Sequence, residues 1–130
     1  MASDPPTIVL DTGALVAVER GSATMRGLIA EAQRTKSVLV TPAAVLARAW
    51  RGGARQVLLA RFLDTCVRGG RLLTRKSWQA AGVLCGKAGT SDVADAAVVI
   101  CARSRGARVV VTSDSSDLRR LDTEVVLRTP

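Results

Sequence analysis

The chain has 130 residues, enough for one domain around a single hydrophobic core and too few for two. Hydrophobic residues make up 48% of it but aromatic residues only 2%, which argues against recognition of RNA by a platform of stacked rings. It contains no histidine, which excludes catalysis and zinc binding through imidazole. Any chemistry must therefore use carboxylates, hydroxyls, thiols or cationic side chains.

The formal net charge is +8, and all of the 19 basic residues except Lys36, Lys76 and Lys87 are arginine. The planar guanidinium group binds phosphates through two hydrogen bonds at once, so this charge supports nucleic-acid binding. An acidic protein partner would suit the same surface. A genome of high GC content, which encodes arginine where another would encode lysine, is a further explanation of the bias.

Short apolar runs alternate with amphipathic segments along the chain. In chain order we predict a strand at Thr7–Leu10, helices at Ala14–Glu19 and Met25–Arg34, a strand at Ser37–Val40, a helix from Pro42 to Arg51 capped by Thr41, a helix at Arg55–Val67, a turn at Gly69–Gly70, a strand at Arg71–Leu73, helices at Ser77–Lys87 and Asp92–Arg105, a strand at Arg108–Val111, one helical turn at Leu118–Leu121 and an edge strand at Glu124–Leu127. Strands separated by helices predict an α/β fold: a parallel sheet flanked by helices, formed by residues 1–130 as one domain.

The cysteines are odd in number and widely spaced, and Cys66, Cys85 and Cys101 each lie in an apolar helical pattern. We interpret them as free buried thiols in a reducing compartment, the cytoplasm. No apolar run approaches the roughly 18 residues that a membrane span needs, so no contact with a membrane is expected.

Four acidic residues are predicted to meet at one edge of the sheet. Asp11 follows the first strand, Asp114 follows the strand at 108–111, and Asp92 and Asp95 begin the helix between them. Each has a structural alternative: Asp11 as a helix cap, Asp92 as a complement to the helix dipole, and Asp114 with Asp117 as turn residues. Several carboxylates at one edge repel each other, however, and a hard cation such as Mg²⁺ or Mn²⁺ would relieve the repulsion.

Three runs carry a resemblance that spans essentially the whole chain: IVLDTGALVAVERG, TPAAVLARAWRGG and TSDVADAAVVICARSRGARVVVTSDSSDL. Their order and spacing are similar to those of PIN-domain proteins, especially VapC-type toxins of toxin–antitoxin pairs. The resemblance implies a metal-dependent endoribonuclease that hydrolyses RNA, forms a homodimer and is held inactive by a VapB-like antitoxin. It implies Asp11, Asp95 and Asp114 as catalytic metal-binding acids, with Asp92 and Asp117 as accessory metal ligands.

The sequence departs from this pattern at Arg48, where active PIN domains usually carry a glutamate. Arginine there would repel a metal ion, or would pair with Asp11 and Asp95 in its place. A catalytically degenerate PIN domain that binds RNA or protein is therefore the alternative function. Glu19 is a distant substitute for the missing acid. A phosphate-accepting receiver domain also gathers acids at a sheet edge, but the lysine that it needs at a strand end is missing.

Further residues are candidates for contact with RNA or a protein partner. They are the hydroxyl residues Thr112 and Ser113 and, as a basic stripe at helical spacing, Arg48, Arg51 and Arg55. The alternatives are a capping role for the two hydroxyls, beside Asp114, and a solvated face for the arginines. Trp50 and Trp78 are expected in the core or in a dimer interface.

Overall fold

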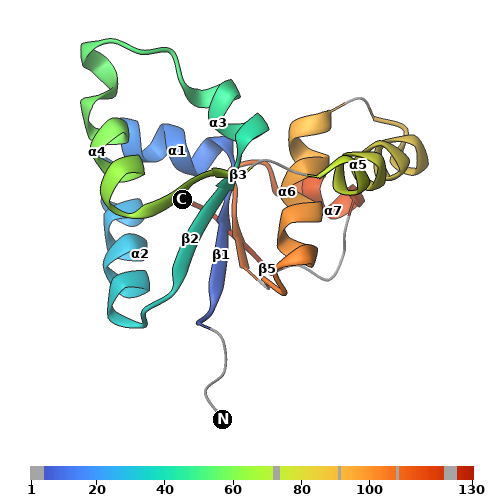
Figure 1. Ribbon diagram of the computed structural model, residues 1–130. Coiled ribbons are helices and arrows are strands. Elements are labelled where there is room, and N and C mark those ends of the chain that lie inside the picture. The colour runs from blue at the N-terminus through green and yellow to red at the C-terminus, as the bar shows by residue number, and fades with distance from the viewer. Residues whose placement is uncertain (1–4, 72–73, 91, 108, 122–125) are drawn as a thin grey trace.

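A parallel sheet of five strands, in the order β3-β2-β1-β4-β5, runs through the molecule (Figure 1). The structure is a computed structural model and describes residues 5–71, 74–90, 92–107, 109–121 and 126–130. The strands are β1 (Thr7–Leu10), β2 (Val38–Pro42), β3 (Val67–Arg71), β4 (Val109–Val111) and β5 (Val126–Arg128). Every neighbouring pair is parallel, as the alternation of strands and helices predicts.

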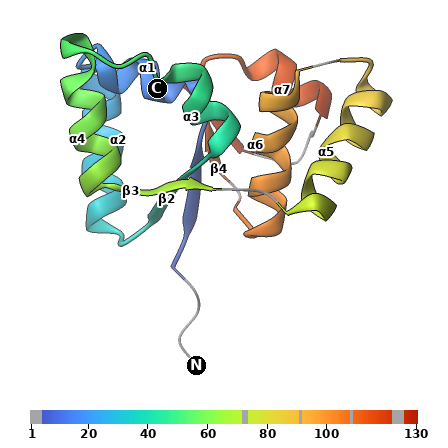
Figure 2. The same ribbon diagram turned by 45° about the horizontal axis from the view of Figure 1, so that its top comes forward.

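Helices cover both faces of this sheet (Figures 1 and 2). On one face lie α1 (Thr12–Glu19), α2 (Ala23–Arg34) and α4 (Val57–Thr65), and on the other lie α5 (Arg75–Ala88), α6 (Val93–Ser104) and α7 (Ser115–Leu121). The short α3 (Ala43–Ala49) contacts both α1 and α6, and a 3-10 turn (Ala54–Gln56) precedes α4. The predicted α/β fold is therefore confirmed.

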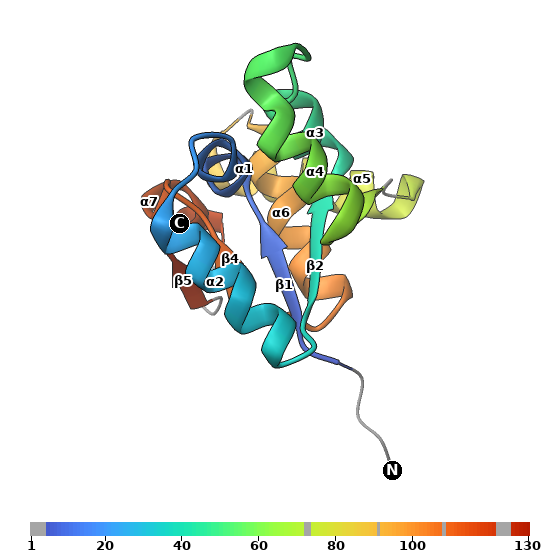
Figure 3. The same cartoon turned by 90° about the vertical axis from the view of Figure 1, so that its left-hand side faces the viewer.

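The central strands are apolar throughout because helices cover both of their faces. Val9, Leu10, Val110 and Val111 are all completely buried. Helix α6 is buried for the same reason, since it packs between the sheet and α5, and every residue from Asp95 to Ala102 is buried. Figure 3 shows α2 and α4 in front of β1 and β2, with α6 behind them. No helix in the described ranges is long and apolar enough to cross a membrane.

The strand order changes direction between β1 and β4. From β1 it proceeds outward to β2 and β3, and it then returns through α5 and α6 to the opposite side of β1. The loops that leave β1 and β4 therefore diverge to opposite faces, which opens a crevice at their carboxyl ends. Ligands of open α/β proteins bind at such a switch point.

Several predicted boundaries are wrong for identifiable reasons. Strand β3 begins at Val67, so the glycines that suggest a turn lie inside it, where Gly70 pairs with Thr41 of β2. The helix predicted up to Val67 accordingly ends at Thr65. Thr41 does not cap α3, because its buried hydroxyl donates to the carbonyl oxygen of Leu10, 3.0 Å away. Residues 72–73 and 124–125 of two predicted strands lie outside the described residues.

Single side chains also differ from expectation. Helix α3 ends at Ala49, two residues before the predicted end. Trp50 is 41% exposed, which excludes the core and leaves the dimer interface as its predicted place. Trp78 is partly buried against a small cluster between α5 and α6. None of the three cysteines forms a disulfide within the described residues; Cys85 and Cys101 are buried and Cys66 is only partly buried.

Gly13 allows the loop after β4 to approach the first turn of α1. A Cβ atom at this position would lie 2.7 Å from the Cβ of Ser113 and 2.9 Å from its backbone nitrogen. Contacts this short do not occur between real atoms of these types, and the backbone of Ser113 cannot rotate away as a side chain would. The glycine therefore sets the spacing between the ends of β1 and β4.

We expect Gly13→Ala to destabilise the protein by about 1–3 kcal/mol, because the added methyl group forces the two loops apart. Gly27 provides the matched control: it lies inside α2, and a methyl group added to it would meet no side chain or neighbouring element within 4 Å. Gly27→Ala should stabilise by about 0.5–1 kcal/mol through its higher helix propensity. Urea denaturation measures both. Equal effects of the two substitutions would contradict the close approach at Gly13.

Candidate active site

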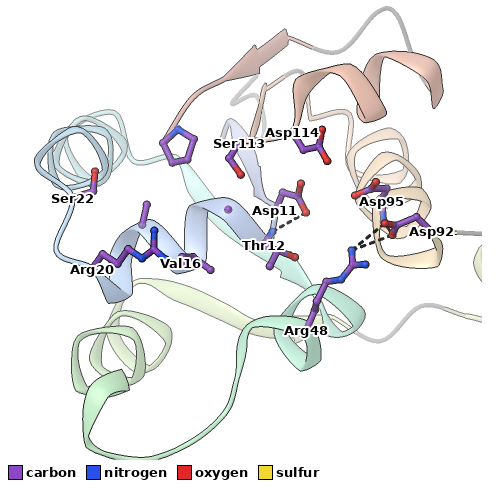
Figure 4. A pocket seen from close by; sticks show the side chains of 13 residues that line it. Asp11, Thr12, Val16, Arg20, Ser22, Arg48, Asp92, Asp95, Ser113 and Asp114 are labelled. Carbon is purple, nitrogen blue, oxygen red and sulfur yellow. Dashed lines mark hydrogen bonds and ion pairs between the residues drawn. The ribbon is translucent and has the colours of Figure 1, made fainter.

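A cavity of about 610 Å³ opens at the switch point between β1 and β4 (Figure 4). It gathers side chains from α1, from the end of α3, from the start of α6 and from the loop after β4. The lining residues that carry charge are the acids Asp11, Asp92, Asp95 and Asp114 and the cations Arg20 and Arg48. The predicted convergence of Asp11, Asp95 and Asp114 at the carboxyl edge of the sheet is thus confirmed.

Asp11 joins the ends of the two central strands. Its carboxylate caps α1 by accepting from the backbone N–H of Thr12 at 2.7 Å, and it also accepts from the Thr112 hydroxyl at 2.7 Å. The same hydroxyl accepts from the backbone N–H of Asp114 at 3.0 Å. Asp11 and Thr112 are almost fully buried, so this chain of hydrogen bonds is shielded from water. Asp11 therefore has both its predicted capping role and a place in the cavity wall.

Asp92 is the acid that pairs with Arg48. One guanidinium nitrogen of Arg48 lies 3.2 Å from each carboxylate oxygen of Asp92. The carboxylate also caps α6 by accepting from the backbone N–H of Asp95 at 3.0 Å. Burial by itself would raise the pKa of Asp92, but the Asp95 hydrogen bond and the Arg48 guanidinium together lower it. The expected pairing of Arg48 with Asp11 and Asp95 is wrong, since its partner is the accessory acid.

Asp95 is the most perturbed group of the cavity. Burial and then the charges of Asp92, Asp11 and Asp114 raise its pKa to about 7, against a partial offset by Arg48. The side chain is only 6% exposed, so water screens this repulsion poorly. The cavity therefore holds more negative charge than it stabilises, which is the electrostatic condition for binding a cation or for keeping a proton.

Two observations bear on whether a divalent metal fits. The carboxylate oxygens that line the cavity are of the kind that Mg²⁺ and Mn²⁺ prefer. The buried hydroxyl of Thr12 has no hydrogen-bond partner in the described ranges, as expected where a water molecule or an ion completes a site. As the side chains stand, however, no three acidic, cysteine or histidine groups among the described residues are close enough to hold one ion. The donor chemistry fits a metal, while the side chains are not arranged around one.

The other predicted site residues fall into three groups. Ser113 lines the cavity, whereas Thr112 lies beneath it and takes the capping role. The basic stripe is wrong as a continuous helix, because α3 ends at Ala49, and the Arg51 guanidinium donates to backbone carbonyls of its own segment. Neither Arg51 nor Arg55 lines the cavity. The side chain of Asp117, in α7, lies outside the described residues.

Sequence reasoning missed Arg20, which lines the cavity from the end of α1. A signal for it is present in the sequence, because positions four apart share a helix face: Thr12, Val16 and Arg20 follow at this spacing. The helix predicted from Ala14 begins too late to show that Arg20 continues the face of Thr12. Glu19, the substitute acid considered from the sequence, does not line the cavity.

Several solved structures match this fold, including the following two. One is a chain of VapBC2 from Rickettsia felis, solved bound to a DNA fragment from their promoter, with a TM-score of 0.73, 16% sequence identity, and 95% of this chain and 98% of that chain covered. The other is PAE2754 from Pyrobaculum aerophilum, with a TM-score of 0.60, 18% identity and coverage of 95% and 92%. No protein-family model and no curated protein matches the sequence. The chain therefore shares its fold with these two proteins.

We expect Asp95→Asn to change the pH dependence of stability. Because folding raises the pKa of Asp95 from 3.8 to about 7, the folded protein binds the extra proton between these values. This group therefore lowers the free energy of unfolding progressively as pH rises from about 4 to 7. Asparagine removes the effect, so the variant should match the wild type near pH 4 and exceed it by on the order of 2 kcal/mol at pH 8.

Urea denaturation across this pH range measures the difference. Asp64→Asn is the control, since Asp64 is exposed on α4 and lies outside the cavity. A constant difference between Asp95→Asn and the wild type at all pH values would contradict the crowding of carboxylates around Asp95.

Proposed function

We propose that this protein is a cytoplasmic, metal-dependent endoribonuclease of the PIN type, in which Asp11, Asp95 and Asp114 hold Mg²⁺ or Mn²⁺. The observation that carries the proposal is the meeting of these acids, with Asp92, in one cavity at the switch point of a PIN-like sheet. An ion bound there would activate water and neutralise charge on the scissile phosphate. The substrate class is RNA, in line with the resemblance that the sequence carries and with the net charge of +8.

The residues of the chain divide the remaining work. Thr112 orients the carboxylate of Asp11 through its hydrogen bond, and the strand ends hold both groups rigid. The raised pKa of Asp95 means that its proton must leave before the side chain can act as a ligand, so metal affinity should increase through neutral pH. The exposed hydroxyl of Ser113 lies in the same cavity and is available to the phosphate.

A second function is favoured by one specific observation, the ion pair between Arg48 and Asp92. The guanidinium supplies part of the positive charge that a metal ion would otherwise bring to this cavity. In that case the protein is a catalytically degenerate PIN domain that binds RNA or protein without cleavage. Because the Arg48 side chain is 49% exposed, it can also leave the cavity when a metal ion binds, which keeps the enzyme function open.

We further propose a VapB-like antitoxin as partner. The name of the Rickettsia felis structure describes VapBC2 as bound to promoter DNA, and that complex is the source of this proposal. The basic surface of the present chain suits an acidic segment of such a partner.

A homodimer is the proposed assembly. Trp50 is 41% exposed next to α3, and Val83 of α5 and Val93 of α6 are more exposed still. We expect a dimeric mass by light scattering at tens of micromolar, and a shift toward the monomer for Trp50→Glu, since the charge would be buried at the interface. Leu58→Glu is the control, on the exposed Leu58 of α4, whose exposed fraction is 50%. A monomeric wild type would contradict the dimer.

We expect Arg48→Glu to raise the affinity for Mn²⁺ at least tenfold and to increase RNA cleavage. A guanidinium a few ångströms from a divalent ion repels it by on the order of several kcal/mol at an effective dielectric near 20. Because the Arg48 side chain is half exposed, solvent screening reduces this repulsion. Arg48→Gln separates loss of the cation from gain of a ligand and should give a smaller increase. Asp11→Asn in the Arg48→Glu background should abolish cleavage.

Calorimetric titration with Mn²⁺ and cleavage of labelled RNA are the two measurements. Arg51→Glu is the matched control: it makes the same charge change three residues away, outside the cavity. A wild-type protein that cleaves RNA as fast as Arg48→Glu at equal metal concentration would show that Arg48 does not limit the site. Metal binding with no cleavage by any variant would favour the degenerate domain.

A further inference from the structure

The cavity that holds the acids has a second, cationic end. Figure 4 shows Arg20 at one end of the cavity and the carboxylates of Asp95 and Asp92 at the other. Ser22, the N-cap of α2, lies at the same end of the cavity as Arg20 (Figure 4). Arg48 also lines the cavity but is paired with Asp92, whereas Arg20 makes no ion pair with any residue that the structure describes. An exposed, unpaired guanidinium at a cavity wall is available to an anion from solution.

Helix α1 connects the two ends. Thr12, Val16 and Arg20 follow each other at intervals of four residues, and Gly13 and Ala17 lie beside them, so one face of the helix lines the cavity throughout. Between the polar ends this face is small and apolar. Nine residues separate Asp11 from Arg20, which corresponds to roughly 13 Å of helix at 1.5 Å per residue. The cavity is thus longer than a single phosphate group needs.

We propose that the Arg20 end is a phosphate subsite, which binds a backbone phosphate of single-stranded RNA that flanks the phosphate at the acids. Consecutive phosphates of a strand lie closer together than the two ends of this cavity, so the RNA segment between the two phosphates would be about two nucleotides long and would lie against Val16 and Ala17. This inference rests on the proposed function and extends it, because it states that the cavity takes an extended strand rather than one nucleotide. Arg20 is a positioning residue in this scheme, since it contacts the substrate away from the reacting phosphate.

Charge and shape favour a single strand of RNA over the other anions that an arginine could bind. A single carboxylate of a peptide could bind Arg20, but a peptide does not carry negative charges at regular intervals. It would therefore not need a second anion-binding position at the other end of α1. A nucleic-acid strand carries a charge on every nucleotide, so it can place one phosphate at each end of the cavity. The acidic end would repel the strand unless a cation is present there, and the unpaired guanidinium of Arg20 offsets this repulsion in part.

The test measures binding of fluorescently labelled hexauridylate by the protein in Ca²⁺ rather than Mg²⁺ or Mn²⁺, so that a cation neutralises the acidic end. Ca²⁺ activates bound water less than Mg²⁺ or Mn²⁺ does, so that binding is measured with little cleavage. Proteins compared are the wild type, Arg20→Gln and, as the matched control, Arg34→Gln, which removes one exposed positive charge at the end of α2 outside the cavity. Arg20→Gln should weaken binding about tenfold. The slope of log affinity against log salt should fall by about 0.7, the value for one lost phosphate contact with a single strand.

Arg34→Gln should change neither the affinity nor the slope by a comparable amount. Equal losses for the two variants would overturn the subsite, because Arg20 would then contribute only general charge. Unchanged RNA binding by Arg20→Gln would overturn the phosphate subsite as well. This holds also if the variant has lost affinity for a protein partner, because Arg20 would then serve that partner and not RNA. Absence of RNA binding by the wild type at low salt would count against the proposed function itself, a result distinct from a failure at Arg20.

Discussion

The hydrogen bond from the Thr112 hydroxyl to the Asp11 carboxylate connects the two strands between which the whole site is built. It crosses from the end of β4 to the end of β1, and the same hydroxyl holds the backbone of Asp114. Gly13 permits the close approach, since any side chain there would meet Ser113. The ends of β1 and β4 are therefore held together, and the acids of α6 line the same cavity as the carboxylates of Asp11 and Asp114.

Excess negative charge is the second property of the site. Asp95 is buried among three other carboxylates, and its burial, followed by the charges of Asp92, Asp11 and Asp114, raises its pKa to about 7. Arg48 neutralises one of them by pairing with Asp92, and Arg20 provides a cation at the far end of the cavity. The arrangement is consequently neither a complete metal site nor a simple ion-pair network. Which ligand balances the remaining charge decides between an enzyme and a binding module.

Structural likeness at 16–18% identity supports the fold and leaves the chemistry to the residues of this chain. The point at which those residues matter most is Arg48, where the sequence departs from the pattern that it otherwise resembles. Its ion-pair partner is Asp92, and it acts on Asp95 only through its charge, without a direct contact. The ion pair with Arg48 is thus formed by the accessory acid Asp92 and not by one of the three acids that the resemblance assigns to the metal.

The sequence by itself determined the parallel α/β fold and the set of acids at its carboxyl edge. Strands β1 and β4 and helix α6 are recognisable because buried elements must be apolar along their whole length, and the ends of parallel strands necessarily share an edge. Strand β3 is rich in glycine, and its composition therefore suggests a turn. It is a strand because it pairs with β2. The place of Arg20 in the cavity follows from helical spacing once α1 is known to begin at Thr12. Only the tertiary structure decided which acid pairs with Arg48. Such contacts depend on the distance between elements far apart in the chain, here α3 and α6, and local patterns of residues do not encode that distance.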